Sequence, residues 1–156
     1  MKNKICLKLK NFAERFKPFA FAFFRIIIGA AFMAPGYMKL MNPAMGIGAA
    51  QGAGFPIPEF FGWLLILTEF VGGLFLILGL FTRFVTIPMM FVMLVAFFAA
   101  HLKSTVLPLT LDTFIAGFIG KGGYELVLIL FASLLIFFAR GAQEFSLDKK
   151  FCKGEA

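Results

Sequence analysis

Long, uninterrupted apolar runs constrain this chain more than any other feature of its sequence. They lie at about residues 19–38, 60–81, 84–101 and 123–139, and each is close to the roughly 17 to 25 residues that cross a bilayer as a helix. Backbone polar groups inside a bilayer must bond within their own segment, which favours helices, and the runs lack the alternation of barrel strands. The sequence therefore predicts an all-α, integral membrane four-helix bundle.

The composition also indicates a membrane protein, and it argues against a soluble globule and against a nucleic-acid-binding protein. Hydrophobic residues make up 61% of the 156 residues and charged residues only 15%, which leaves too little polar surface to cover a soluble globule. The net charge of +7 would suit nucleic acid, but the basic residues stand at the chain ends and span boundaries. We therefore expect membrane lipids as the surroundings and no nucleic-acid partner.

The distribution of Lys and Arg predicts the orientation. With the N-terminus inside, eleven of the 15 basic residues fall on the cytoplasmic side and three on the outer side. Residues 1–18 then form a basic cytoplasmic tail, residues 19–140 the membrane domain and residues 141–156 a cytoplasmic C-terminal tail. This predicts a multi-pass protein of the cell (inner) membrane with an N-in/C-in topology.

Two interpretations of the basic tail remain open. Its basic residues are interleaved with Leu7, Phe12 and Phe16, so it is either a tail that only sets orientation or a short amphipathic segment at the membrane surface. A removable signal peptide is disfavoured, because the following apolar run is long and contains Arg25.

The residues that bind metals are scarce. Cys6 and Cys152 lie near opposite ends of the chain, without a CxxC pair or a Cys/His cluster, and there is one histidine. We therefore predict no metal site and no intrinsic cofactor, since zinc, iron–sulfur and bis-His haem sites need more ligands than these.

Charged residues within spans are costly and usually face the bundle interior, paired. The two deepest are Arg25 and Glu69. Counted from the expected span edges at Phe19 and Phe60, their Cα heights differ by about 7 Å, which a guanidinium can bridge. We therefore expect an Arg25–Glu69 ion pair, which either locks two spans together or serves a polar site.

Small residues share the faces of these two charges. Gly29 and Gly36 project on the side of Arg25, and Gly62 and Gly73 on the side of Glu69. Because glycine lets helices approach closely in lipid, we predict that these glycines pack the first two spans together.

Further ionisable groups lie nearer the predicted outer surface. Lys39 ends the first span, His101 ends the third and Glu125 opens the fourth, so their depths match. His101 is either an interfacial residue or part of a site, and Glu125 is either a solvated partner of Lys121 or part of a site.

A series of short motifs follows in order along the chain. They are Arg25–Gly29, Gly36–Leu40, Glu69–Gly73, Leu78–Arg83, Gly122–Glu125, Arg140–Gly141 and Ser146–Asp148. Together they resemble the DoxX family of small bacterial and archaeal membrane proteins, over about residues 20 to 150.

The resemblance implies a four-helix bundle associated with quinone-linked or thiol and sulfur redox chemistry. Some relatives are subunits of a quinone-linked thiosulfate oxidoreductase, and others are membrane partners of redox-defence enzymes. Carried over by motif, Arg25, Lys39, Glu69 and Glu125 are the family-like polar positions, and His101 fits less closely. A diffusible quinone and a redox-enzyme partner subunit are the ligand and partner that the resemblance implies.

Three functions follow from these features. The leading hypothesis is a membrane subunit that binds a quinone or similar amphiphile between its helices, with Arg25 and Glu69 supplying charge or proton transfer. One alternative is a small proton- or ion-coupled carrier, for which a homo-oligomer stays open. The other is a structural membrane anchor for a soluble oxidoreductase.

Overall fold

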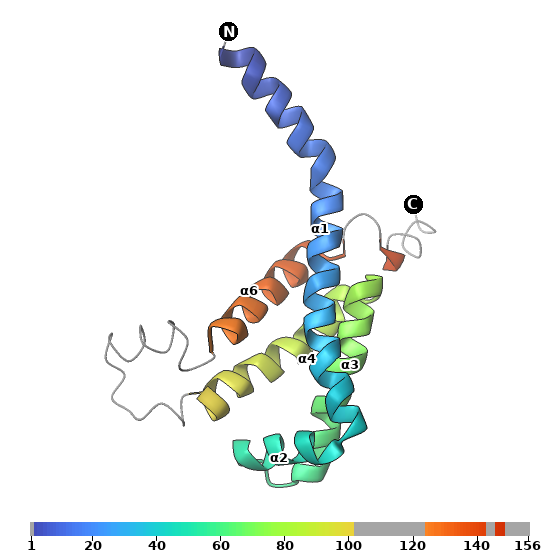
Figure 1. Ribbon diagram of the computed structural model, residues 1–156, viewed down its shortest axis with the longest axis vertical. Helices are drawn as coiled ribbons and strands as arrows, with labels where there is room; N and C mark the ends of the chain where they lie inside the picture. Colours follow the sequence, from blue (N-terminus) through green and yellow to red (C-terminus); the bar gives the residue numbers. More distant parts are fainter. Residues whose placement is uncertain (1, 102–123, 143–145, 149–156) are drawn as a thin grey trace, which may run out of the picture.

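The chain is built from helices, as the apolar runs predict. The computed structural model describes residues 2–101, 124–142 and 146–148, and no strand occurs in these ranges. The elements are α1 (Lys2–Met41), α2 (Pro43–Ala53), α3 (Pro58–Leu78), α4 (Thr82–Val95), the π-helical η1 (Ala96–His101) and α6 (Tyr124–Arg140), as Figure 1 shows. The prediction of an all-α chain is confirmed.

Proline and glycine set the ends of α2 and α3. Pro43 and Pro58 stand at the helix starts, where the missing N–H has no intrahelical partner to lose. Gly54 and Gly79 end the two helices with φ of 86° and 66°, a conformation that glycine adopts without strain.

The connections between the helices differ from what the spacing of the apolar runs suggests. Residues 41–59 are rich in Gly, Ala and Pro and lie between the first two apolar runs, but Pro43–Ala53 forms α2 between a proline start and a glycine cap. Thr82 and Arg83 separate the second and third apolar runs in the sequence, but the turn between α3 and α4 lies at residues 79–81 and Thr82 begins α4. Residues 104–120, between the third and fourth apolar runs, lie outside the described residues.

The helices pack side by side around one apolar core. α1 lies along α3, α3 packs on α4, and α4 packs on α6, while α2 crosses near the end of α3 (Figure 1). α1, α3, α4 and α6 all contribute buried core residues: Ile28, Phe32, Leu76, Met89, Met93, Leu130, Leu134 and Phe137.

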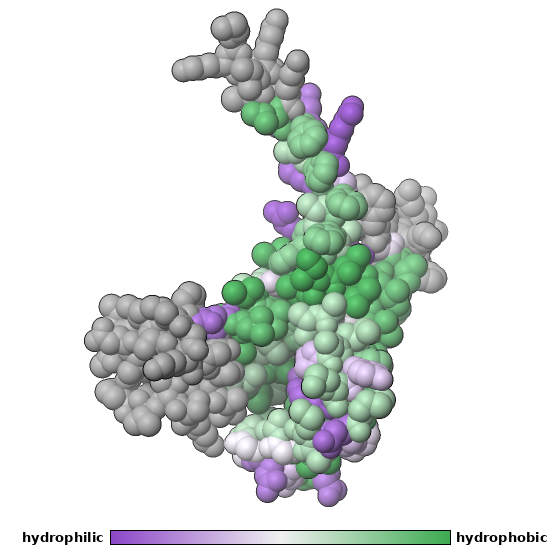
Figure 2. Space-filling view, viewed as in Figure 1, coloured by the Kyte–Doolittle hydropathy of each residue, from purple (hydrophilic) through white to green (hydrophobic). Residues whose placement is uncertain are grey.

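The outer surface of these helices is also apolar. Phe84 is 74% exposed, and many other large hydrophobic side chains of α1, α3, α4 and α6 are exposed as well. On the face in Figure 2, hydrophobic residues cover the middle, and hydrophilic ones gather on the projecting part of α1 and around the α2 end. Leu9–Met41 and Pro58–Leu78 are long and apolar enough to cross a membrane, and Thr82–Phe98 is a shorter apolar helix.

Candidate functional site

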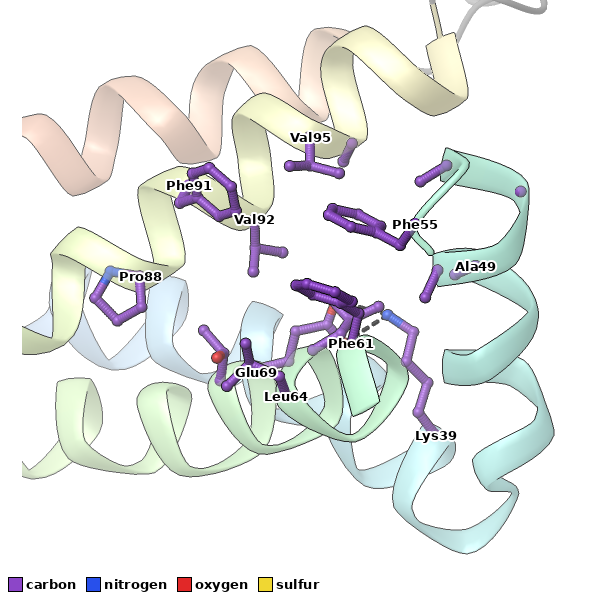
Figure 3. A pocket seen from close by; sticks show the side chains of 16 residues that line it. Lys39, Ala49, Phe55, Phe61, Leu64, Glu69, Pro88, Phe91, Val92 and Val95 are labelled. Atoms are coloured by element: carbon purple, nitrogen blue, oxygen red, sulfur yellow. Dashed lines mark hydrogen bonds and ion pairs between the residues drawn. The ribbon is translucent and has the colours of Figure 1, made fainter. Parts of the chain in front are cut away.

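A cavity of about 400 Å³ lies between α2, α3, α4 and η1. This volume is in the range of pockets that hold small molecules. Most of its lining is apolar, with Phe55 and Phe61 stacked on one side at 4.4 Å between ring centroids. The residues of α4 face them across the cavity (Figure 3): Pro88, Phe91, Val92 and Val95.

The charged groups of this cavity are Lys39 and Glu69. The Lys39 Nζ donates to both Glu69 carboxylate oxygens at 2.6 Å, as the dashed line in Figure 3 marks. The side chains are 19% and 7% exposed, so the pair is largely removed from solvent. An ammonium has three N–H donors and a carboxylate has about four acceptor positions, so the pair keeps hydrogen-bonding capacity for a ligand.

Close contact between α1 and α3 brings this pair together. A Cβ on Gly36 would lie 2.5 Å from the backbone N of Phe70, so only a glycine allows the two backbones to approach here. Glu69 is therefore level with Gly36, one turn before Lys39 on α1. The lysine side chain needs to reach only across the helix contact.

Arg25 is not the partner of Glu69, so the predicted Arg25–Glu69 pair is wrong. Gly29 of α1 faces Gly73 of α3, and Gly36 faces Phe70, so the two helices run antiparallel. Arg25 is then separated from the level of Glu69 by about 16 Å along α1, at 1.5 Å per residue. The expectation failed because it measured depth from assumed span edges, whereas α1 and α3 extend beyond them.

Arg25 instead lies at the other end of α3. It is buried, and its Nη1 donates to the carbonyl oxygen of Ala142 at 2.6 Å. A Cβ on Gly79 would meet the guanidinium at 2.6 Å, so Arg25 fills the space beside the α3–α4 turn. Asp148 is near enough to attract it electrostatically.

Asp148 is a key residue that the sequence identified only as the end of the motif Ser146–Asp148, without a role. Its carboxylate accepts hydrogen bonds from the backbone N–H of Phe81 and Thr82 at 2.7 and 3.1 Å, at the start of α4. Its own N–H donates to the carbonyl of Gly79 at 3.0 Å. An acidic side chain commonly caps a helix start in this way, although usually from the preceding residue and not from 66 residues away.

The four predicted packing glycines divide between two contacts. Gly29, Gly36 and Gly73 lie where α1 meets α3. Gly62 lies against α2 instead, where a Cβ would be 2.7 Å from the Cα of Ile47. Its place follows from α2, which lies outside the four predicted spans.

Comparison with known proteins places the chain among relatives. A family model described as DoxX matches residues 20–102, which is more than half of the chain. The chain belongs to the DoxX family. The resemblance carried by the short motifs is thereby confirmed, and this DoxX protein is a membrane protein by its family and its long apolar helices.

The relatives of this DoxX protein extend over most of its length. A protein of Haemophilus influenzae, described as an uncharacterized protein, is 32% identical over 152 residues, covering 92% of this chain and 98% of that protein. A Mycobacterium tuberculosis protein, described as an uncharacterized membrane protein, is 28% identical over 137 residues, covering 83% and 79% of the two chains. No solved structure matches the chain.

Of the other predicted polar residues of this DoxX protein, Glu125 can be placed relative to the cavity. Glu125 lies in the first turn of α6 and is not among the residues that line it. Its Oε1 is buried, without a hydrogen-bond partner in the described part of the chain. His101 ends η1, and its side chain lies outside the described residues.

The arrangement suits binding of an amphiphile better than binding of a metal. Within residues 2–101, 124–142 and 146–148, no three His, Cys, Asp or Glu side chains gather as metal ligands would. The cavity offers an apolar body, two stacked aromatic rings and an ion pair of the buried Glu69 with the half-buried Lys39.

Proposed function

We propose that this DoxX protein is a multi-pass protein of the cell (inner) membrane in which α1, α3, α4 with η1, and α6 form a transmembrane four-helix bundle. The 17 residues of α6 extend about 26 Å at 1.5 Å per residue, close to the hydrocarbon thickness of about 30 Å. The excess of basic residues at the two chain ends supports an N-in/C-in topology. The cavity would then lie toward the outer leaflet, near α2.

Within this bundle, the cavity is the site at which a quinone or a similar amphiphile binds. The observation that carries this proposal is an apolar cavity of about 400 Å³ with the Lys39–Glu69 pair in its wall. A planar head group would lie beside Phe55 and Phe61, since aromatic rings favour stacked or edge contacts. The apolar tail would follow the lining of α4.

The ion pair supplies the chemistry of the proposed site. An N–H of Lys39 would donate to a quinone carbonyl and stabilise the negative charge that forms there when an electron arrives. Glu69 would take up or release the proton that accompanies reduction or oxidation of the head group. The electrons would come from an associated redox enzyme, as the family resemblance implies.

Arg25 has a different role in this proposal from the one expected from sequence. It bonds to Ala142 beside the α3–α4 turn, far along α3 from the cavity. We assign it to holding the helix ends together, and we assign the polar site to Lys39 and Glu69.

A binding titration with a short-chain quinone tests the proposal. Purified protein in detergent should bind the quinone saturably, and Glu69→Gln should weaken binding about ten-fold through loss of the charged partner that orients Lys39. Ala53→Phe, which adds a ring to the cavity wall, should weaken binding more strongly.

Phe84→Leu is the matched control, because Phe84 is exposed and does not line the cavity. It should bind as the parent protein does. If Ala53→Phe and Phe84→Leu bind the quinone equally well, the cavity is not the site.

One observation favours a second function, a proton- or cation-coupled carrier. Pro88 interrupts the hydrogen bonding of α4 beside the cavity, and the same cavity holds the part-buried Lys39–Glu69 pair. Buried ionisable pairs at broken helices are typical of transport sites. Flux into proteoliposomes that Glu69→Gln abolishes, without any quinone binding, would favour the carrier.

A further inference from the structure

α1 is much longer than a helix needs to be to cross the hydrocarbon core of a membrane. Its 40 residues extend about 60 Å, twice the hydrocarbon thickness of about 30 Å. The part that packs on the other helices begins near Phe21, whose ring lies 5.3 Å from that of Phe137. The described part of α1 before Phe21 therefore extends beyond the bundle, as Figure 1 shows.

This projecting part of α1 carries an uncovered aromatic stripe. Leu9, Phe12 and Phe16 are 63%, 64% and 53% exposed. The rings of Phe12 and Phe16 lie 5.3 Å apart and those of Phe16 and Phe19 6.0 Å apart, so the side chains follow one face of the helix. No other element of the described chain covers this face.

Basic residues flank this stripe on both sides. At 100° per residue, Lys10 and Lys17 lie on one flank and Arg15 on the other, each roughly 90 to 130° from the middle of the stripe. Lys17 forms an ion pair with Glu14 on the same helix. Lys2, Lys4 and Lys8 add further positive charge, against the single acidic residue Glu14. An apolar stripe flanked by basic residues is the pattern of helices that lie in a membrane interface.

The helix also contains a point at which it can turn. Pro18 stands inside α1, where its ring removes one backbone hydrogen bond and weakens the helix locally. In Figure 1 the N-terminal part of α1 leans away from the line of the rest of the helix. Pro18 lies at the predicted boundary between the bundle and the basic segment.

We propose that residues 2–18 of α1 bend at Pro18, lie along the bilayer surface and bind anionic phospholipid head groups. Leu9, Phe12 and Phe16 enter the interfacial layer, and the basic side chains pair with lipid phosphates. The choice of an anionic lipid over a protein partner rests on charge, because the segment combines strong positive charge with an apolar stripe that continues directly from a membrane-spanning helix. This proposal does not depend on what the cavity binds.

Tryptophan fluorescence in nanodiscs of defined lipid composition tests it on the full chain. In a Trp63→Phe background, Phe16→Trp places the sole tryptophan in the stripe, and Asn11→Trp places it roughly 140° away on the helix as a matched control. Lipids brominated high on the acyl chain quench a tryptophan that lies in the interface. With phosphatidylglycerol present, the Phe16→Trp protein should be quenched at least about two-fold more than the Asn11→Trp protein.

A charge series separates lipid binding from simple hydrophobic contact. Each basic residue near an anionic surface strengthens association about five-fold, so replacing Lys10, Arg15 and Lys17 together by Gln should weaken docking about 100-fold and abolish the quenching. The charge-conserving pair Lys10→Arg with Lys17→Arg should retain it. Added salt should release the segment.

Two results would overturn the proposal. Equal quenching in phosphatidylcholine alone would show that the anionic head group is not recognised. Unquenched Trp at position 16 in every lipid would show that the segment stands away from the bilayer, free for a soluble partner instead.

Discussion

The Lys39–Glu69 pair gives a prediction whose size can be worked from its geometry. At 2.6 Å and an effective dielectric constant of about 20, the attraction is about 6 kcal/mol, and much of it offsets the cost of removing both charges from water. Lys39→Met leaves a carboxylate that is 7% exposed without its partner, and should destabilise the protein by about 3 kcal/mol. Glu69→Gln keeps an acceptor for the lysine, which is 19% exposed, and should cost about 1.5 kcal/mol.

The double variant Lys39→Met with Glu69→Gln should lower the free energy of unfolding by about 2 kcal/mol. This is less than the sum of the two single costs, because neither charge is left unpaired. The free energy of unfolding can be measured by steric trapping in mixed micelles. The control cycle combines Arg25→Met with Glu69→Gln, and it should be additive within about 0.5 kcal/mol, since Arg25 on α1 lies about 16 Å from the level of Glu69 on α3. Additive effects for Lys39 and Glu69, or strong coupling between Arg25 and Glu69, would refute the arrangement.

Three further predictions concern packing, capping and topology. Gly73→Ala should destabilise the protein by about 2 kcal/mol or more in thermal unfolding, because the new Cβ would lie 2.7 Å from the Gly29 carbonyl oxygen. The control Gly48→Ala adds a Cβ that meets nothing within 4 Å, so it should be neutral or stabilising by up to about 1 kcal/mol. Asp148→Ala should cost about 1 to 2 kcal/mol by the same measurement through loss of the cap on α4, and an effect no larger than that of an exposed surface substitution would contradict the cap. Impermeant thiol reagents should label Cys6 and Cys152 only from the cytoplasmic face, and protection of either thiol in inverted vesicles would contradict the N-in/C-in topology.

The helices themselves could be predicted because hydropathy reports directly on the solvent. A segment such as residues 60–81 has no polar face with which to meet water, so its class and approximate length follow from composition. The structure places this helix at Pro58–Leu78, with its ends moved by a proline and a glycine. These ends depend on caps and turns, which hydropathy does not detect.

The partner of Glu69 could not be predicted, because it depends on the register between two helices. The sequence identified Glu69, Lys39 and Arg25 as polar groups inside or beside spans, but the register is fixed by the contact of Gly36 with Phe70. A shift of a few residues in the register between α1 and α3 decides which of the two cations comes near Glu69. The depth of a residue in the membrane, when it is counted from a predicted span edge, carries an error of that size.

The capping role of Asp148 was missed for a different reason, although the residue belongs to the motif Ser146–Asp148. Its bonds to Phe81 and Thr82 join the end of the chain to a turn far away in sequence, and periodicity cannot show such a contact. The available signal was chemical: the α4 start has an apolar residue, Phe81, in the capping position, so its backbone N–H groups needed an acceptor from elsewhere.

The most direct test of the central claim is photo-cross-linking of a quinone that carries an azide on its head group, followed by mass spectrometry of the labelled peptides. If the cavity is the binding site, the adducts will fall on the α2, α3 and α4 residues that line it, with Phe61 and Val92 among them, and excess unlabelled quinone will remove them. Adducts confined to exposed positions outside the cavity, such as Phe84, or adducts that unlabelled quinone does not compete away, would contradict the account.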